Sequence, residues 1–136
     1  MNIFGGDVLT ALSKALDAYA ERQRVTAHNL ANINTPGFKK SVVKFEEALA
    51  RSLGRGDRLN IKRTHPRHLG GVDLHGLRPE TVKVEGTSMR PDGNNVDMET
   101  EMVNLVANTL SYQMASQALY KEFEKMGYII RGGGSL

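Results

Sequence analysis

The sequence predicts a mainly α-helical fold, with a long helix at each end of the chain and a loop region with a small β element between them. Apolar residues repeat at three-and-four spacing near both ends, and Gly and Pro gather between them. Each terminal helix has one apolar stripe to bury, so we expect the two to pair as an antiparallel coiled coil. We divide this single structural unit into an N-terminal helix and turn (1–38), a basic central region (39–95), a C-terminal helix (96–131) and a flexible tail (132–136).

The N-terminal helix is predicted by the spacing of its apolar residues, which alternate by three and four positions as a heptad seam does. Gln23 and Thr26 make the middle of this seam polar, and Asp7 suits the positive end of the helix dipole. A helix of about 25 residues is about 37 Å long and cannot bury such a stripe by itself. The predicted seam residues of this helix are Leu9, Leu12, Leu16, Tyr19, Leu30 and Ile33.

The phrase from His28 to Lys39 predicts where this helix ends. Pro36 disfavours a helical conformation at Thr35, and Pro followed by Gly37 is typical of a type II turn. The helix should therefore end near residues 32–34. Asn29 and Asn32 lie three positions apart and share one helix face. They either make a specific polar contact or merely cap the helix end in solvent. The candidate signature residues are Asn29, Leu30, Asn32, Asn34, Thr35, Pro36, Gly37 and Phe38.

The central region differs in charge and in pattern from both ends. Residues 39–90 contain 12 Lys and Arg against 6 Asp and Glu, a net charge of +6, within a chain of net +3. Phe45, Ala48 and Leu49 favour one or two helical turns, and residues 58–61 and 81–85 are strand-like. The apolar residues of this region are too few to enclose a large core. We therefore expect a small β element or a loop that orders against neighbours.

The C-terminal helix repeats the three-and-four spacing, with Thr109 and Ser116 as small or polar members at its centre. Asp97 is the expected N-cap, followed by acidic residues in the first turns, while Lys and Arg gather near the other end. Polar centres in both stripes allow one register in which they meet, although an ordinary bundle core explains the same pattern. The predicted seam residues are Met102, Leu105, Tyr112, Leu119, Phe123 and Met126.

The sequence offers no catalytic constellation, so we expect that the protein is not an enzyme and holds no cofactor. It has no cysteine, which excludes thiol nucleophiles and cysteine zinc sites. His65, His68 and His75 lie near Asp73, but Pro66 interrupts any helix there, so no metal site is predicted. The basic residues are dispersed and few aromatics lie among them, which disfavours nucleic-acid binding. No apolar run approaches the length of a membrane span.

Three blocks carry a family resemblance. Residues 28–39, with Asn-Leu-Ala-Asn-Ile-Asn-Thr-Pro-Gly-Phe after His28, resemble the N-terminal signature of the bacterial flagellar axial proteins, the rod and hook family. Residues 92–103 resemble the start of the C-terminal helix of proximal rod proteins. Residues 64–69 resemble a block typical of one of the two short proximal rod proteins, the other being FlgC. The short chain also fits these two better than the longer distal rod or hook proteins. FlgC itself and a generic helical interaction module remain the alternatives.

This resemblance implies a structural subunit of the flagellar basal body that forms the proximal rod, in the periplasm, by helical self-assembly of its terminal helices. The implied partners are further copies of the chain, FlgC, FliE and components of the export gate or MS ring, without nucleic acid and without a membrane span. Export through the flagellar type III apparatus is implied, with no cleaved signal peptide. We expect the terminal helices to remain partly disordered until neighbours cover their stripes.

Overall fold

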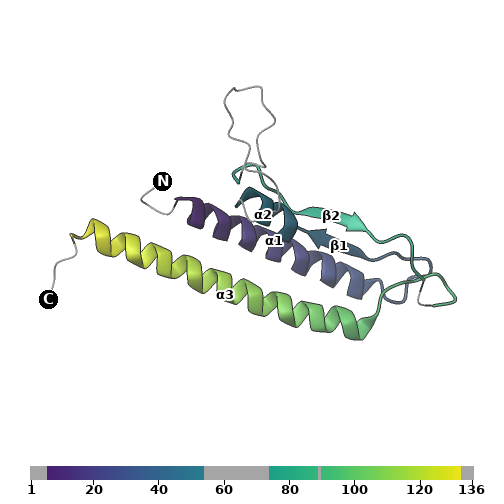
Figure 1. Ribbon diagram of the computed structural model, residues 1–136. Coiled ribbons are helices and arrows are strands. Elements are labelled where there is room, and N and C mark those ends of the chain that lie inside the picture. Colours follow the sequence, from purple (N-terminus) through teal and green to yellow (C-terminus); the bar gives the residue numbers. More distant parts are fainter. Residues whose placement is uncertain (1–5, 54–73, 89, 133–136) are drawn as a thin grey trace, which may run out of the picture.

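The computed structural model of the protein describes residues 6–53, 74–88 and 90–132. Its elements, in chain order, are α1 (Gly6–Ala31), β1 (Ser41–Lys44), α2 (Glu46–Ser52), β2 (Glu80–Lys83) and α3 (Met98–Ile130). Helices α1 and α3 lie side by side and run in opposite directions, while β1, β2 and α2 cover α1 (Figure 1). The prediction of a mainly helical fold with a small β element is confirmed.

Helix α1 ends one residue before the predicted stop, at Ala31. The backbone N–H of Phe38 then donates to the Thr35 carbonyl at 3.3 Å, closing a four-residue turn. Gly37 has φ of +70°, the left-handed value that the third position of a type II turn requires. The predicted Pro-Gly turn is therefore confirmed, and it directs the chain from α1 into β1.

The central region forms a two-stranded antiparallel sheet and one short helix. In the register of this sheet, Val42 of β1 lies opposite Val82 of β2. The strand predicted at 81–85 is found as β2, which begins one residue earlier and ends two residues earlier, and the predicted helical turns form α2. Strand β1 was not predicted, although its Ser-Val-Val run is rich in β-branched residues. The strand predicted at 58–61 lies outside the described residues.

The apolar core lies between α1 and the central region, not between the two long helices. Its centre is formed by Ala18, Phe45 and Leu77, with Ala15, Ala48 and Leu49 packed around them. By contrast, the residues of α3 that become buried are polar, namely Glu101 and Asn108. The described part of the chain thus stabilises α1 with apolar burial and positions α3 with hydrogen bonds.

Helix α3 is the longer of the two, with 33 residues against 26 in α1. At 1.5 Å per residue these lengths are about 50 Å and about 39 Å. The amide Nδ2 of Asn108 donates to the Tyr19 carbonyl, and Asn29 contacts Glu101, so the N-terminal half of α3 lies against the C-terminal half of α1. The last turns of α3 consequently extend past the start of α1, as Figure 1 shows, and Ile130 is 83% exposed.

Candidate functional site

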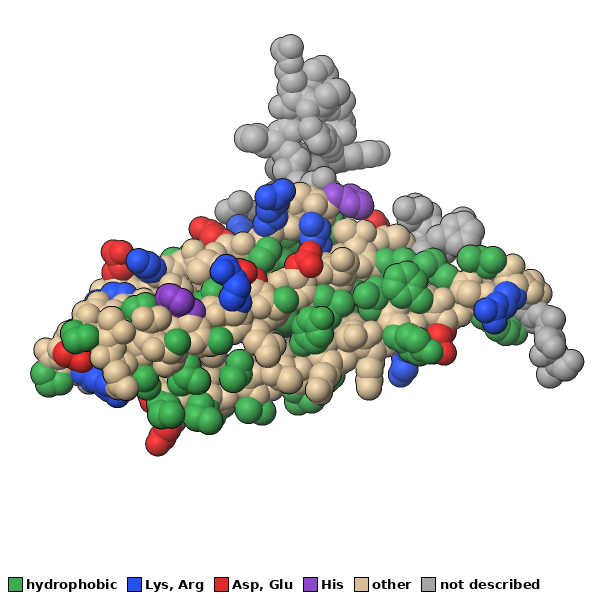
Figure 2. Space-filling model, turned by 180° about the vertical axis from the view of Figure 1, so that it is seen from behind, with side chains coloured by type: hydrophobic (Ala, Val, Ile, Leu, Met, Phe, Trp, Pro, Cys, Tyr) green, Lys and Arg blue, Asp and Glu red, His purple; other side chains and the backbone are tan. Residues whose placement is uncertain are grey.

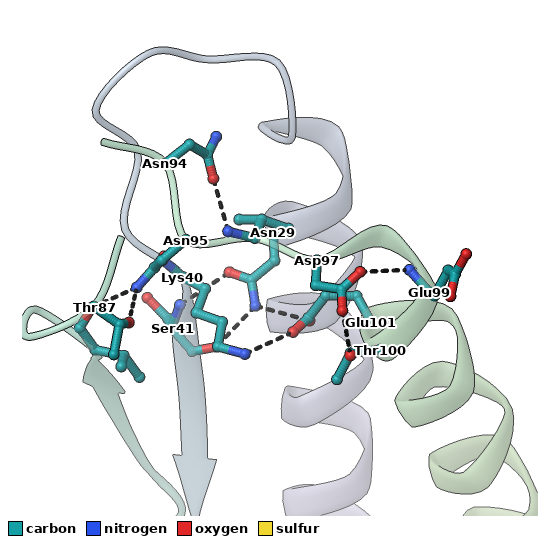
Figure 3. Close-up of polar contacts among 12 residues, drawn as sticks. Asn29, Lys40, Ser41, Thr87, Asn94, Asn95, Asp97, Glu99, Thr100 and Glu101 are labelled. Atoms are coloured by element: carbon teal, nitrogen blue, oxygen red, sulfur yellow. Dashed lines mark hydrogen bonds and ion pairs between the residues drawn. The ribbon is translucent and has the colours of Figure 1, made fainter. Parts of the chain in front are cut away.

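The signature asparagine Asn29 lies at the centre of a buried polar cluster that joins three elements (Figure 3). Its Nδ2 donates to the Ser41 carbonyl at 2.8 Å and to Glu101 Oε2 at 3.0 Å. Its Oδ1 accepts the Ser41 backbone N–H at 3.0 Å. One amide of α1 therefore holds both the start of β1 and the first turn of α3. We call Asn29, Ser41, Glu101, Asn94 and Asn95 the asparagine junction.

Glu101 is a buried carboxylate, 3% exposed as a residue. Besides the bond from Asn29, its Oε1 lies 3.6 Å from Lys40 Nζ, the residue that precedes β1. A buried carboxylate is tolerated where hydrogen bonds and an opposite charge compensate its lost hydration. Glu101 thereby fixes the start of α3 on the end of α1.

Asn94 satisfies the backbone at the end of α1. Its Nδ2 lies within hydrogen-bond distance of the carbonyl oxygens of Asn32, Ile33 and Thr35, at 3.2, 3.0 and 2.9 Å. These carbonyls lie in the turn that follows α1, where neither a helix nor a sheet pairs the backbone groups. The side chain of Asn94 reaches them across the loop, while its Oδ1 accepts the backbone N–H of Val96 at 2.7 Å.

Asn95 does the same for the sheet. Its Oδ1 accepts the Lys40 backbone N–H at 2.7 Å, and its Nδ2 donates to the Val84 carbonyl at 2.8 Å (Figure 3). Both groups lie just beyond the two paired strands. The segment that leads into α3 is thus tied to α1 through Asn94 and to the strand ends through Asn95.

Two glycines let the loops approach each other at this junction. The backbone N–H of Gly37 donates to the Asp92 carbonyl at 2.9 Å. Gly93, with φ of +82°, lies so near that a Cβ built on it would be 3.7 Å from the Gly37 Cα. Positive φ is strained for residues that carry a Cβ, so both positions of this loop crossing favour glycine.

The other signature residues divide between the junction and the surface. Asn32 makes a local bond, its Nδ2 donating to the His28 carbonyl at 2.9 Å. Phe38 is half-buried with its ring 5.5 Å from that of His28, and Leu30 is half-buried. Asn34, Thr35 and Pro36 are exposed. Of the two readings of the asparagine pair, Asn29 thus makes a specific contact and Asn32 caps the helix.

The predicted seam residues differ in burial between the two helices. The N-terminal members are all half-buried, although Ile33 lies beyond the end of α1 at Ala31, and Leu105, Leu119 and Met126 of α3 are half-buried too. Met102, Tyr112 and Phe123 are 50, 40 and 56% exposed. A strict 3.5-residue pattern drifts by about 20° per heptad around a straight helix, so one stripe cannot face α1 along all of α3.

The most buried face of α1 was not the predicted one. Ala18, Val25, Thr26 and Asn29 are buried, and of these only Thr26 lies in the predicted stripe. Helix α1 is covered on one side by α3 and on another by the central region. The central region packs against the small residues Ala15 and Ala18.

Sequence reasoning missed the partners of Asn29. Glu101 was expected only to favour the helix dipole, and Asn94 and Asn95 were regarded as loop residues. A signal did exist for Glu101, because it lies four and seven residues before Leu105 and Asn108, on the same helix face.

A groove of about 310 Å³ runs beside this junction between α1, β1 and α3. Arg22, Thr26, Val42, Asn104 and Asn108 are among the residues that line it. Arg22 is already engaged, because one guanidinium nitrogen donates to Glu46 Oε1 at 2.5 Å. The polar side chains that line the groove include amides and hydroxyls, which can form hydrogen bonds to a bound group. No nucleophile among these lining residues contacts a general base, so the groove shows no catalytic arrangement.

The histidine cluster lies partly outside the described residues. His65, His68 and Asp73 lie outside the described residues, whereas His75 lies within them and is exposed. Within residues 6–53, 74–88 and 90–132, no group of three or more His, Asp or Glu side chains is placed to hold a metal ion. None of the helices described there is long and apolar enough to cross a membrane.

Comparison with known proteins agrees with the signature. The family model for the flagella basal body rod protein matches residues 9–39, which cover most of α1 and the turn after it. The flagellar basal body rod protein FlgB of Borrelia hermsii is 34% identical over 96% of this chain and its own whole length. FlgB of Bacillus subtilis is 31% identical over 98% of this chain and 99% of its own. FlgB of Escherichia coli is 30% identical over 88% and 90%. These relatives span nearly the whole chain, and the chain therefore belongs to the FlgB family of flagellar basal body rod proteins.

Proposed function

We propose that this protein is a proximal rod subunit that assembles helically with further copies of itself through its two terminal helices. Its family makes it a structural component of the flagellar basal body rod, and its relatives are named as rod proteins, not as enzymes. The observation that carries the assembly mechanism is the large apolar surface that α3 leaves uncovered. Val103, Val106, Leu110 and Ile130 are among its exposed residues, at 67, 70, 56 and 83%.

Such a surface favours contacts beyond one subunit. Scattered apolar side chains are normal on protein surfaces, but contiguous ones along a helix are typical of interaction sites. Figure 2 shows hydrophobic and uncharged side chains along the lower edge of the molecule, where α3 runs, with charged side chains towards the two ends of this helix. A long solvated helix would carry charge throughout that edge.

Within the subunit, we propose that α1 and α3 act as an antiparallel coiled coil. The half-buried seam residues Leu16, Leu30 and Leu119 support this pairing. The register is supported by polar contacts, since Asn108 Nδ2 donates to the Tyr19 carbonyl at 2.9 Å. A polar group at such a seam favours the register in which its donor meets an acceptor, as Asn108 Nδ2 does here, although Asn108 Oδ1 is buried without a hydrogen-bond partner in the described chain.

The overhang of α3 suits an open assembly. A contact between two different surfaces does not close on itself and generates a helical filament. The projecting last turns of α3 and the junction end of the molecule are different surfaces at opposite ends of the helix pair, as Figure 1 shows. Ordering of the exposed turns is then coupled to assembly, as for segments that fold on binding.

The proposed location and partners follow from the family. We infer a periplasmic rod position, export through the flagellar type III apparatus without cleavage of a signal peptide, and contacts with FlgC, FliE and components of the export gate or MS ring. The chain has no cysteine, so its folding after export needs no disulfide, which is compatible with this route.

A pair of α1 variants tests the role of the seam. Leu16→Asp places a charge on the half-buried seam, whereas Ser13→Asp places the same charge on an exposed position of the same helix. In a strain that lacks the native gene, the proposal predicts export of both chains, rods with Ser13→Asp, and no rods with Leu16→Asp. Circular dichroism of both purified chains separates a loss of assembly from a loss of helix. Normal rods built from Leu16→Asp would remove the seam from the mechanism.

A further inference from the structure

The groove between α1, β1 and α3 contains two polar groups that nothing in the described chain satisfies. Thr26 and Asn108 both line it and are only 5 and 4% exposed. Asn108 Oδ1 is buried without a hydrogen-bond partner, and the Thr26 hydroxyl also has no partner among the described residues. Buried polar groups of folded proteins are nearly always hydrogen-bonded. The pair therefore points to a hydrogen-bonding group that enters the groove from outside the subunit.

The charges around the groove favour a neutral occupant. Among its lining residues Arg22 alone is charged, and the Arg22 guanidinium is already paired with Glu46 and donates to the Val43 carbonyl. A charged group inserted there would lose its hydration without meeting an unpaired opposite charge, which is unfavourable. An amide or a hydroxyl, by contrast, can donate to Asn108 Oδ1 and can also bond the Thr26 hydroxyl. The groove is thus suited to uncharged side chains that carry these groups.

The size of the groove restricts the shape of its occupant. The groove holds about 310 Å³, whereas an α-helix with its side chains is about 10–12 Å across. A helix from another subunit is too wide to enter such a space. A turn built from residues with small side chains can enter it.

The turn after α1 has the required size and chemistry. Its residues 34–37, which we call the signature turn, are exposed and uncharged, and they lie where the chain passes from α1 to β1 (Figure 1). The Asn34 side chain makes no hydrogen bond in the described chain, and the Thr35 hydroxyl makes one bond of 3.3 Å, to Asn32. The neighbouring loop is charged, with exposed Glu85, Arg90 and Asp92.

We propose that the signature turn of one copy of this chain inserts into the groove of the next copy, where the Asn34 amide or the Thr35 hydroxyl donates to Asn108 Oδ1. This inference rests on the proposed self-assembly and names one contact that carries it. The turn and the groove are different surfaces, so copies in the same orientation repeat the contact in one direction without closing. The exposed residues of the signature turn thereby gain a role that they lack within one subunit.

Disulfide crosslinking in assembled basal bodies tests this contact, because the chain has no cysteine of its own. The full chain with Thr35→Cys and Asn104→Cys, expressed in a strain without the native gene, carries one cysteine on the turn and one at the groove, both at exposed positions. The matched control combines Thr35→Cys with Gln113→Cys. Gln113 is also exposed, but it lies nine residues from Asn104 and so on the opposite side of α3.

The inference predicts a ladder of dimers, trimers and longer species after oxidation, joined through positions 35 and 104, and no such ladder from the control. Dimers without longer species would indicate a closed pair and would overturn the inference. Equal crosslinking of the control, or no crosslinks in rods that contain the double variant, would overturn it as well. Basal bodies that lack the wild-type chain would instead overturn the proposed function.

An exchange of charges gives a second test, with rod formation as the readout. Thr35→Lys and Asn104→Glu each bring an unpaired charge into the contact, so each alone should give few or no rods. The two together can form an ion pair and should restore rods, which a loss of folding would not allow. Ala27→Glu, at an exposed position of α1 that does not line the groove, should form rods. Normal rods from both single variants, or no recovery in the double variant, would contradict the contact.

Discussion

Asn29 Nδ2 lies 3.0 Å from Glu101 Oε2, and this buried hydrogen bond joins the two terminal helices across 72 positions of sequence. The same amide also holds Ser41 at the start of β1. The first asparagine of the family signature thus has a structural role, because Asn29 holds the start of α3 against the end of α1.

Replacing Asn29 should destabilise the fold more than replacing its neighbour Asn32. Asn29→Ala removes three hydrogen bonds, one of them to a buried carboxylate. Leaving such groups without partners costs about 2–4 kcal/mol in the free energy of unfolding. Asn32→Ala removes two exposed local bonds, one to the His28 carbonyl and one from the Thr35 hydroxyl, and should cost about 1 kcal/mol or less. Urea unfolding followed by circular dichroism measures both, and equal effects would contradict the role assigned to Asn29.

Asn94 should matter through the end of α1. Asn94→Ala leaves the carbonyls of Ile33 and Thr35 without the amide that now lies 3.0 and 2.9 Å away. Those carbonyls keep bonds from Arg90 and Phe38, but the buried backbone N–H of Val96 loses its acceptor, Asn94 Oδ1. We expect a loss of about 1–3 kcal/mol, typical of a buried group left unsatisfied. Hydrogen exchange should also become faster in the turn that follows α1. Asn34→Ala, at an exposed position of the same turn, is the control and should change neither quantity appreciably.

The glycines of the loop crossing should differ from a glycine elsewhere. Gly37→Ala forces a Cβ onto a residue with φ of +70°, which costs about 1 kcal/mol or more. Gly86 does not have a positive φ and has nothing within 4 Å of the position of an added Cβ. Gly86→Ala should therefore be neutral or slightly stabilising. The shift in thermal midpoint of each variant distinguishes these cases, and a neutral Gly37→Ala would contradict the left-handed turn.

Stability should depend on pH through the N-cap of α3. Hydrogen bonds from the Thr100 hydroxyl and the Glu99 backbone hold the pKa of Asp97 below its ordinary value of 3.8. A carboxyl with a lowered pKa in the folded state contributes stability that is fully present above its unfolded pKa. That stability is lost as the pH falls through the folded pKa.

The variant Asp97→Asn isolates this contribution, because Asn also caps helices but does not titrate. Wild type should be the more stable protein at neutral pH, and the difference should shrink as the pH falls below 3.8, the ordinary value. Denaturant midpoints of both proteins measured between pH 7 and about 2.5 provide the test. A difference that does not change with pH would show that the carboxylate charge of Asp97 contributes nothing.

The sequence predicted local features of this fold better than long-range ones. The end of α1, the turn at Pro36 and Gly37, and the cap at Asp97 each depend on the conformational preference of a few adjacent residues, and each was found as expected. Strand β1 was missed because a four-residue strand is defined by its pairing with β2 more than by its own composition.

The candidate site shows the same limit. Asn29 was recognised as a polar group on a helix face, but its partners lie 12 and 72 residues away, and hydropathy spacing carries no information about them. The seam was predicted as one stripe on each helix. Only the packed structure shows that α1 has two covers and that much of the apolar surface of α3 faces outwards.

The most direct test of the rod assignment is a chromosomal deletion of this gene, with motility scored and basal bodies imaged by electron microscopy. We predict cells that do not swim and that carry membrane rings without a rod, with both defects restored by expression of this chain. Motile cells with intact rods would contradict the assignment and would favour a generic helical interaction module instead.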